Sequence, residues 1–344
     1  MQLQLKLPKP KIEDIQFYFQ ESGLLKNLRN AVVYVMGSLG RGEADNGSDI
    51  DLIICSPDFQ YHKYECLIWN GYLIDQNCMS LETLKDFAED PDWENMVAES
   101  SVLIDHDGQG VKFRDCLRGK QRDGKHRILQ CSVLLKDAKK LLGICDLNKN
   151  EIAVKPVLID VGYFGITSLC AFINLTRGSY SDHFQKAENA FDKLGCKELY
   201  RQYEELHSPP DFSPETMISL TKELIHSINH HLAKLKLEGG VPESKEFKAF
   251  VVVHRALYLK QNNKIKPAIF VFRRMIMSLL LPYCLKLSRG YYKKNRLNSA
   301  EVIIVQECID RNVLHLIDNI FAGVEYAGFK NWLNSLIRGV NVND

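Results

Sequence analysis

Two aspartates, Asp49 and Asp51, stand two residues apart at the start of an apolar run. Side chains on a β-strand alternate between its faces, so residues i and i+2 point the same way and these carboxylates would converge. Neighbouring ionised carboxylates repel each other unless a cation lies between them, and Mg²⁺ is the usual cation where oxygen ligands meet phosphates. The pair therefore indicates a metal site, and the alternative interpretation is a solvated strand end.

A glycine and a hydroxyl residue, Gly37 and Ser38, follow another apolar run, and Ser38 stands eleven residues before Asp49. Backbone N–H groups at the start of a helix favour phosphate, and a glycine lets the phosphate come close. Ser38 adds a hydroxyl donor, and Arg41 adds a cation about one turn further along. This arrangement predicts phosphate binding beside the metal, and the alternative is a plain strand–turn–helix connection.

The segments that would position these residues lie in about the first 110 residues, where strand-like and helix-like patterns alternate. Turn signals such as Asn46-Gly47, Asn70-Gly71 and Asp107-Gly108 separate the runs. A short amphipathic helix is expected at 81–89. The predicted strands cover residues 31–36, 48–55, 72–79 and 101–105.

Helical spacing replaces this pattern after about residue 120. Ser213 followed by Pro214 predicts a helix start, and Gly195 predicts a helix end. We therefore expect two domains, an α/β domain over residues 1–120 and an all-helical domain over residues 121–344. The predicted helices lie near 126–144, 152–176, 182–194, 197–206, 214–237, 245–261, 267–288, 299–320 and 324–338.

The composition is that of a soluble globular protein, with 45% hydrophobic and 25% charged residues in 344 and a net charge of +1. The ten cysteines include no CxxC pair, which favours reduced core thiols over a disulfide framework. The most apolar stretch, 267–287, contains Arg273 and Arg274 and is not expected to cross a membrane. No signal peptide is predicted, so a cytoplasmic location is expected.

Two motifs stand close together in the sequence: Gly37-Ser38-Leu39-Gly40-Arg41-Gly42-Glu43 and Ser48-Asp49-Ile50-Asp51-Leu52. Together they resemble the signature of the DNA polymerase β-like nucleotidyltransferase superfamily. The Arg-Gly-Glu of the first motif is most similar to the smaller members, the minimal nucleotidyltransferases of toxin–antitoxin pairs and the antibiotic adenylyltransferases. The resemblance covers about residues 30–110, and its one departure is Gly40, where a helix former such as Ala would be expected.

The resemblance implies an α+β fold, with a polymerase β-like domain of mixed sheet and flanking helices followed by the all-helical domain. It also implies a third carboxylate on a neighbouring strand. Asp75 is the best candidate, because an acid in an apolar strand is costly unless it meets a cation. The competing acids are Glu65, Asp105 and Asp107. On this basis Asp49, Asp51 and Asp75 are the expected catalytic metal ligands, and Gly37, Ser38, Arg41 and Ser48 the expected nucleotide-binding residues.

The implied enzyme is a nucleotidyltransferase that moves a nucleoside monophosphate, most simply AMP, from ATP or another NTP to an acceptor hydroxyl. Pyrophosphate leaves, and two Mg²⁺ ions act together. Asp75 would take the proton of the acceptor hydroxyl, which a small molecule, a protein side chain or an RNA end could supply. The alternatives are a non-catalytic nucleotide- or nucleic-acid-binding regulatory protein and a toxin–antitoxin component.

Two further patterns in the helical region leave alternatives open. The stretch Arg255–Arg296 has eleven Lys or Arg and no Asp or Glu, which indicates nucleic-acid contact or a basic face packed inside the protein. The spacing from Arg177 to His183 is similar to that of HEPN-type RNases. It is also compatible with a loop that reaches the nucleotide site, or with a plain turn.

Overall fold

The computed structural model divides into two compact units, with the division along the chain between Gln130 and Cys131. The boundary expected between residues 120 and 121 falls inside helix α5 (Gln109–Arg122), which this division keeps whole in the first unit. The structure describes residues 9–46, 48–146, 151–173, 175, 183–207, 212–235, 265–287 and 311–340, together with 249, 253, 256, 259 and 260.

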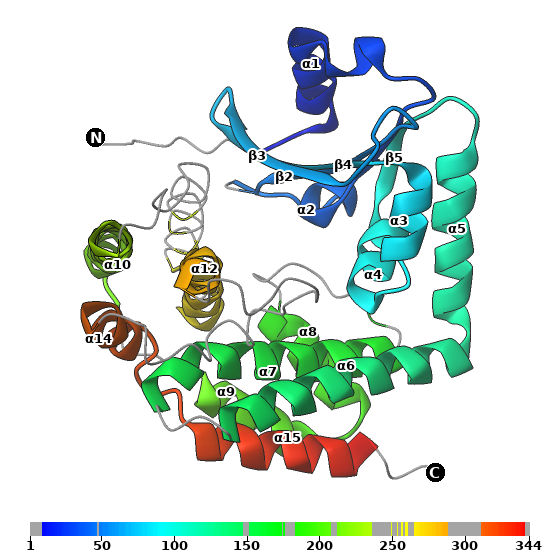
Figure 1. Cartoon of the computed structure of the whole chain (residues 1–344). Coiled ribbons are helices and arrows are strands. Elements are labelled where there is room, and N and C mark those ends of the chain that lie inside the picture. Colours follow the sequence, from blue (N-terminus) through cyan, green and yellow to red (C-terminus); the bar gives the residue numbers. More distant parts are fainter. Residues whose placement is uncertain are drawn as a thin grey trace. The chain divides into compact units, whose positions relative to one another are not determined.

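The first unit is built on a five-stranded mixed sheet with the strand order β3-β4-β2-β1-β5 (Figure 1). β2 and β4 pair in parallel, and the other neighbouring pairs are antiparallel. A mixed sheet with flanking helices followed by a helical region confirms the predicted α+β fold. The strands are β1 (Val32–Val35), β2 (Ile50–Cys55), β3 (Lys63–Trp69), β4 (Tyr72–Met79) and β5 (Ser101–Asp105).

Helices cover both faces of the sheet because β1, β2, β4 and β5 present apolar side chains to both sides. Ile15 and Phe19 of α1 (Ile12–Ser22) pack with Val33 and Leu52 on one face. Leu84 and Leu117, from α3 and α5, pack with Tyr34 and other residues of the opposite face (Figure 1). The remaining elements of this unit are η1 (Leu24–Asn27), α2 (Gly37–Gly40), α3 (Leu81–Phe87) and α4 (Pro91–Glu99).

Five elements of this unit were not predicted: α1, η1, β3, α4 and α5. The signal for β3 was present, because Asn70-Gly71 between two β-rich runs is a strong hairpin pattern, and Asn70 and Gly71 have φ of 48° and 83°. The signal for α4 was also present. Asp90 accepts a hydrogen bond from the Asp92 N–H at 2.7 Å, and Pro91 occupies the first turn.

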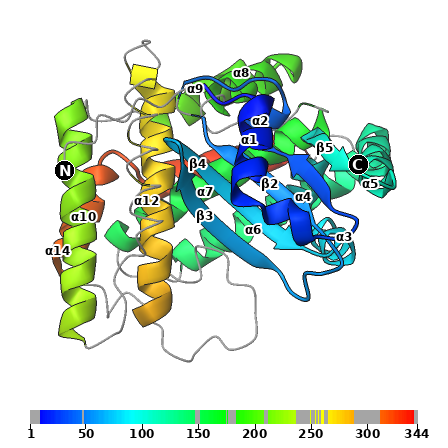
Figure 2. The same ribbon diagram turned by 90° about the horizontal axis from the view of Figure 1, so that it is seen from above.

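The described residues of the second unit form helices and the turns between them, and the unit includes most of α6 (Gly124–Asp146). α7 packs against α8, α12, α14 and α15, and α10 lies beside α12 and α14 (Figure 2). The predicted helices correspond to these elements, except that most of 245–261 and all of 299–310 lie outside the described residues. The elements are α7 (Glu151–Phe172), α8 (His183–Lys193), α9 (Lys197–Leu206), α10 (Pro214–Lys234), α12 (Ile265–Leu287), α14 (Arg311–Ile320) and α15 (Tyr326–Val340).

α7 is long and apolar enough to cross a membrane by length and composition, over Ile152–Phe172. However, 78% of that window is buried inside the protein, as in the core helix of a globular fold.

His183 belongs to the core of this helical unit, so the hypothesis that it serves an RNase site or reaches a nucleotide is wrong. Its ring is 3% exposed, stacks on Phe270 with centroids 4.4 Å apart, and hydrogen-bonds the Tyr203 hydroxyl at 2.5 Å. Burial lowers the pKa of His183 to about 3. His207 lies in the same cluster, and burial, with Arg273 and His183 nearby, lowers its pKa well below the usual value.

These buried histidines predict a loss of stability in mild acid. In the unfolded chain they take up a proton near pH 6.5, whereas in the folded chain they stay neutral. Their stabilising contribution is therefore complete above pH 6.5 and falls as the pH drops, by about 1.4 kcal/mol per pH unit for each histidine. Urea midpoints followed by circular dichroism should be clearly lower at pH 5.5 than at pH 7.

The exposed His226 of α10 offers a matched control, because His226→Gln should leave this pH dependence unchanged. Equal urea midpoints at pH 7 and 5.5 would contradict the neutral, buried state of the two rings.

Arg273 and Arg274 are engaged inside the helical unit, which for these two residues favours the alternative of a basic face packed inside the protein over contact with nucleic acid. Arg273 is fully buried and donates to the carbonyl oxygens of Ile320 and Ala322 at 3.1 and 2.7 Å. Arg274 pairs with the buried Asp160 and lies over the ring of Tyr163. A buried guanidinium needs such partners, and these contacts hold both groups inside the protein. Lys293, Lys294 and Arg296 lie outside the described residues.

Candidate metal and nucleotide site

Three carboxylates, those of Asp49, Asp51 and Asp75, meet at one end of the sheet. One oxygen from each lies within 4.8 Å of the others. Asp75 is only 5% exposed, and the other two are partly buried. The prediction that Asp75 lies close to the first two aspartates is confirmed. Three acids this close together repel one another strongly, so the cluster calls for a cation.

The strand pairing explains why these residues meet. Asp51 and Asp75 are direct partners in the parallel ladder between β2 and β4. Direct partners project their side chains from the same face of a sheet, so the two carboxylates lie side by side. Asp49 precedes β2 by one residue and stands two positions before Asp51, which accounts for its approach from the same direction.

The turn after β1 closes on the same carboxylates. Met36 donates its N–H to the carbonyl oxygen of Asp51 at 2.8 Å, which ties the turn to β2. Gly37 has a φ of 62°, and a Cβ added there would lie 2.3 Å from Asp51 Oδ2. The side chain of Asp51 therefore occupies the space that any larger residue at position 37 would need.

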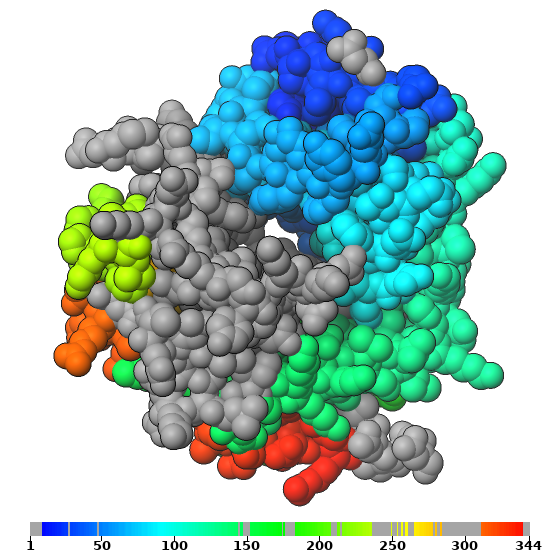
Figure 3. Space-filling view, in the orientation of Figure 1, coloured from blue at the N-terminus to red at the C-terminus, as the bar shows by residue number. Residues whose placement is uncertain are grey.

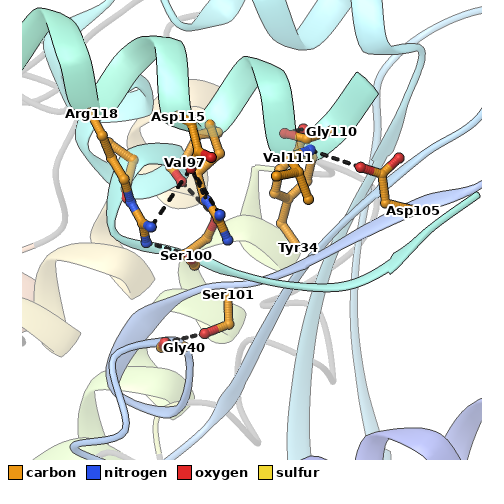
Figure 4. Close-up of polar contacts among 12 residues, drawn as sticks. Tyr34, Gly40, Val97, Ser100, Ser101, Asp105, Gly110, Val111, Asp115 and Arg118 are labelled. Atoms are coloured by element: carbon orange, nitrogen blue, oxygen red, sulfur yellow. Dashed lines mark hydrogen bonds and ion pairs between the residues drawn. The ribbon is translucent and has the colours of Figure 1, made fainter. Parts of the chain in front are cut away.

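Gly40, the one departure from the family motif, also has a structural reason. A Cβ at this position would lie 2.1 Å from the carbonyl oxygen of Val35, so α2 packs too closely on β1 to admit alanine. Ser101 of β5 fixes this end of the turn by donating its hydroxyl to the Gly40 carbonyl at 2.7 Å (Figure 4). The turn is thus held by β1, β2 and β5 together.

Two of the predicted nucleotide-binding side chains, Arg41 and Ser48, contact other residues of the domain. Arg41 is 11% exposed and pairs with Glu43 at 2.7 Å and Glu99 at 3.3 Å. Ser48 donates its hydroxyl to Asp45 at 2.9 Å and accepts the Asp45 N–H, so it closes the loop before β2. Both contacts stabilise the frame of the site, and their roles toward a nucleotide stay predictions.

Ser38 is partly buried in the first turn of α2, next to Gly37. Its carbonyl oxygen accepts the N–H of Glu43 at 2.7 Å, which closes the turn. The predicted role of its hydroxyl toward phosphate is likewise untested.

The competing acids lie elsewhere. Asp105 is at the opposite end of β5, where its Oδ2 accepts the Val111 N–H at 2.8 Å and starts α5 (Figure 4). Asp107 accepts the Gln109 N–H in the same loop. Glu65 accepts a hydrogen bond from Gln76 and forms an ion pair with Lys63. Its strand partner is Gln76, the neighbour of Asp75, so Glu65 and Asp75 project from opposite faces of the sheet. None of these three joins the triad.

Tyr64, a residue that the sequence did not single out, also contacts the triad. Its hydroxyl donates to Asp75 Oδ1 at 2.9 Å. Finding this contact from sequence would have required both β3 and its register, because Tyr64 and Asp75 are diagonal neighbours across the β3–β4 pair.

Comparison with known families agrees with this geometry. Residues 21–100 match the family model described as a nucleotidyltransferase domain. These residues form a nucleotidyltransferase domain. It contains the whole triad and the α2 turn, and it accounts for about a quarter of the chain.

One similar solved structure is a nucleotidyltransferase-like protein from Exiguobacterium sibiricum. It is 11% identical, with 83% of this chain and 80% of that chain covered, and the TM-score is 0.31. No curated protein matches the sequence. The assignment of the nucleotidyltransferase domain therefore depends on the family match over residues 21–100.

Proposed function

We propose that the protein is an enzyme that transfers a nucleoside monophosphate, most simply AMP, from an NTP to an acceptor hydroxyl and releases pyrophosphate. The observation that carries this proposal is the convergence of Asp49, Asp51 and Asp75 beside the Gly37-Ser38 turn, inside a nucleotidyltransferase domain. The site is taken to work in the cytoplasm, which stays a prediction from the sequence.

The donor set fits Mg²⁺. All three side chains offer carboxylate oxygens, the ligands that hard divalent cations prefer, and among the described residues no thiol or imidazole belongs to the cluster. Asp49 and Asp51 would hold two ions in common, and Asp75 would hold one of them. When bound, the ions would offset negative charge on the phosphoryl group and on the attacking and leaving oxygens.

The residues of the chain would divide the remaining work. Ser38 and the backbone of the Gly37 turn would bind the outer phosphates, and Gly37 would keep Asp51 and the phosphates in close approach. Asp75 would accept the proton of the acceptor hydroxyl. Arg41 would act through its pairs with Glu43 and Glu99, which hold the turn in shape.

We propose that the acceptor is a small molecule or a protein side chain and not a polyanion. Residues 42–107, which contain the triad, carry sixteen Asp or Glu and only two Lys. Several of these acids are exposed, and their negative charge would disfavour the approach of an RNA or DNA backbone. Arg273 and Arg274, at the centre of the basic stretch, bind carbonyl oxygens and a carboxylate inside the helical unit.

The acceptor and the nucleotide can be found in one experiment. The full chain is incubated with Mg²⁺ and each of the four α-labelled triphosphates in turn, and RNA, protein and metabolite fractions are scanned for label. Label from ATP in protein or metabolites is expected. Label confined to RNA would overturn the acceptor proposal, and label from a different triphosphate would replace AMP.

A further inference from the structure

Tyr64 lies where it could control the third carboxylate of the site. It belongs to β3, an edge strand of the sheet, and the residue is 41% exposed. Its hydroxyl nevertheless reaches inward and donates to Asp75 Oδ1 at 2.9 Å. The light-blue part of the chain that includes β3 and β4 reaches the surface of the first unit in Figure 3.

The strand register fixes this contact. Tyr64 is paired with Asn77 and Cys66 with Asp75, so Tyr64 lies diagonally across from Asp75 on the same face. Diagonal neighbours in an antiparallel pair are about 7–8 Å apart at Cα, which a tyrosine can span and a short side chain cannot. A contact across this diagonal therefore needs a long side chain, and Tyr64 supplies one that ends in a hydroxyl.

Asp75 also needs a partner that fixes its orientation. Asp75 is only 5% exposed, and one of its carboxylate oxygens lies within 4.8 Å of an oxygen of each of the two other acids. A carboxylate has about four lone-pair sites, so the bond from Tyr64 does not by itself prevent the group from binding a cation. Partners that hydrogen-bond a metal-binding carboxylate set its orientation, and their loss typically lowers metal affinity by about 10–100-fold.

We propose that Tyr64 is a positioning residue of the metal site, which holds the Asp75 carboxylate turned toward Asp49 and Asp51. This inference rests on the proposed function, because it assumes that the three acids bind a divalent cation. Through Tyr64, β3 would contribute to the metal site as well as to the sheet.

The test measures metal binding directly and does not depend on knowing the acceptor. Mn²⁺ is titrated into the full chain and the free ion is followed by electron paramagnetic resonance. Tyr64→Phe removes the hydroxyl and keeps the ring, and we expect Mn²⁺ affinity to fall by about 10-fold or more. The matched control is Tyr61→Phe, the same change at a residue that is 74% exposed, which should bind like the wild type.

Asp75→Asn distinguishes a failure of the positioning role of Tyr64 from a failure of the metal site itself. If the wild type binds Mn²⁺ and Asp75→Asn loses it, but Tyr64→Phe binds normally, the positioning role is wrong and the metal site stands. If the wild type fails to bind Mn²⁺, or Asp75→Asn binds it equally well, the metal site itself is wrong.

A purely structural role for Tyr64 predicts a different pattern. It would lower the thermal midpoint of Tyr64→Phe, and added metal would not restore transfer. The positioning role predicts that the half-saturating Mg²⁺ concentration for transfer rises in Tyr64→Phe, and that excess Mg²⁺ restores most of the rate. A reduced rate that no Mg²⁺ concentration restores would overturn the proposal.

Discussion

Replacing Asp49 or Asp51 by asparagine should reduce nucleotidyl transfer by at least about 10³-fold, while the fold is retained. Asparagine keeps the size of the side chain but removes the charge that would bind a divalent cation. The site then loses several kcal/mol of charge stabilisation in the transition state, and each 1.36 kcal/mol corresponds to a factor of ten in rate. Transfer rates of the purified variants, measured with excess Mg²⁺, test this expectation.

Stability measurements add a second readout to these variants. Without metal, Asp51→Asn should be at least as stable as the wild type, because it removes one of three repelling charges. Added Mg²⁺ should raise the thermal midpoint of the wild type much more than that of the variant. Asp86→Asn, the same change at an exposed position of α3, should behave like the wild type in both assays. Wild-type transfer by Asp49→Asn and Asp51→Asn would rule out the site.

Replacing Gly37 by alanine should lower transfer by about 10²-fold, although position 37 carries no reactive group. The new Cβ would lie 2.3 Å from Asp51 Oδ2, so the carboxylate must move by about 1 Å or the turn must open. A displacement of this size commonly costs about 10²-fold in rate. The φ of 62° adds a backbone cost of about 1–2 kcal/mol.

Gly42→Ala separates these two effects. Gly42 also has a positive φ, of 75°, but a Cβ there would meet nothing within 4 Å. This variant should lose a similar amount of stability and keep most of its transfer activity. If Gly37→Ala and Gly42→Ala retained the same activity, the close approach of Gly37 to Asp51 would not contribute to transfer.

Local signals were sufficient to predict much of the fold. β4 and β5 have the bounds expected from their apolar runs, 72–79 and 101–105. The helices after residue 120 followed from periodicity and from caps such as Ser213, whose side chain accepts the Thr216 N–H. β3 was missed although its turn was seen, because its residues alternate weakly and it lies half exposed at the edge of the sheet.

The candidate site was less predictable, because its contacts join residues far apart in sequence. Asp49 and Asp51 could be paired from strand periodicity alone, whereas Asp75 needed the family resemblance, since the β2–β4 register is not written locally. The pairing of Arg41 with Glu99 joins α2 to the end of α4. The tight packing that requires Gly40 depends on the path of β1. Such contacts follow from tertiary packing, which spacing along the chain does not determine.

The most direct test of the central proposal uses the position of a radioactive label in ATP. The full chain and Asp51→Asn are incubated in parallel with Mg²⁺, a cell extract freed of nucleotides, and ATP labelled at either the α- or the γ-phosphate. The proposed function predicts that the wild type attaches α-label to an acceptor and releases γ-label as pyrophosphate, and that Asp51→Asn does neither. Attachment of γ-label, or equal attachment of α-label by both proteins, would contradict it.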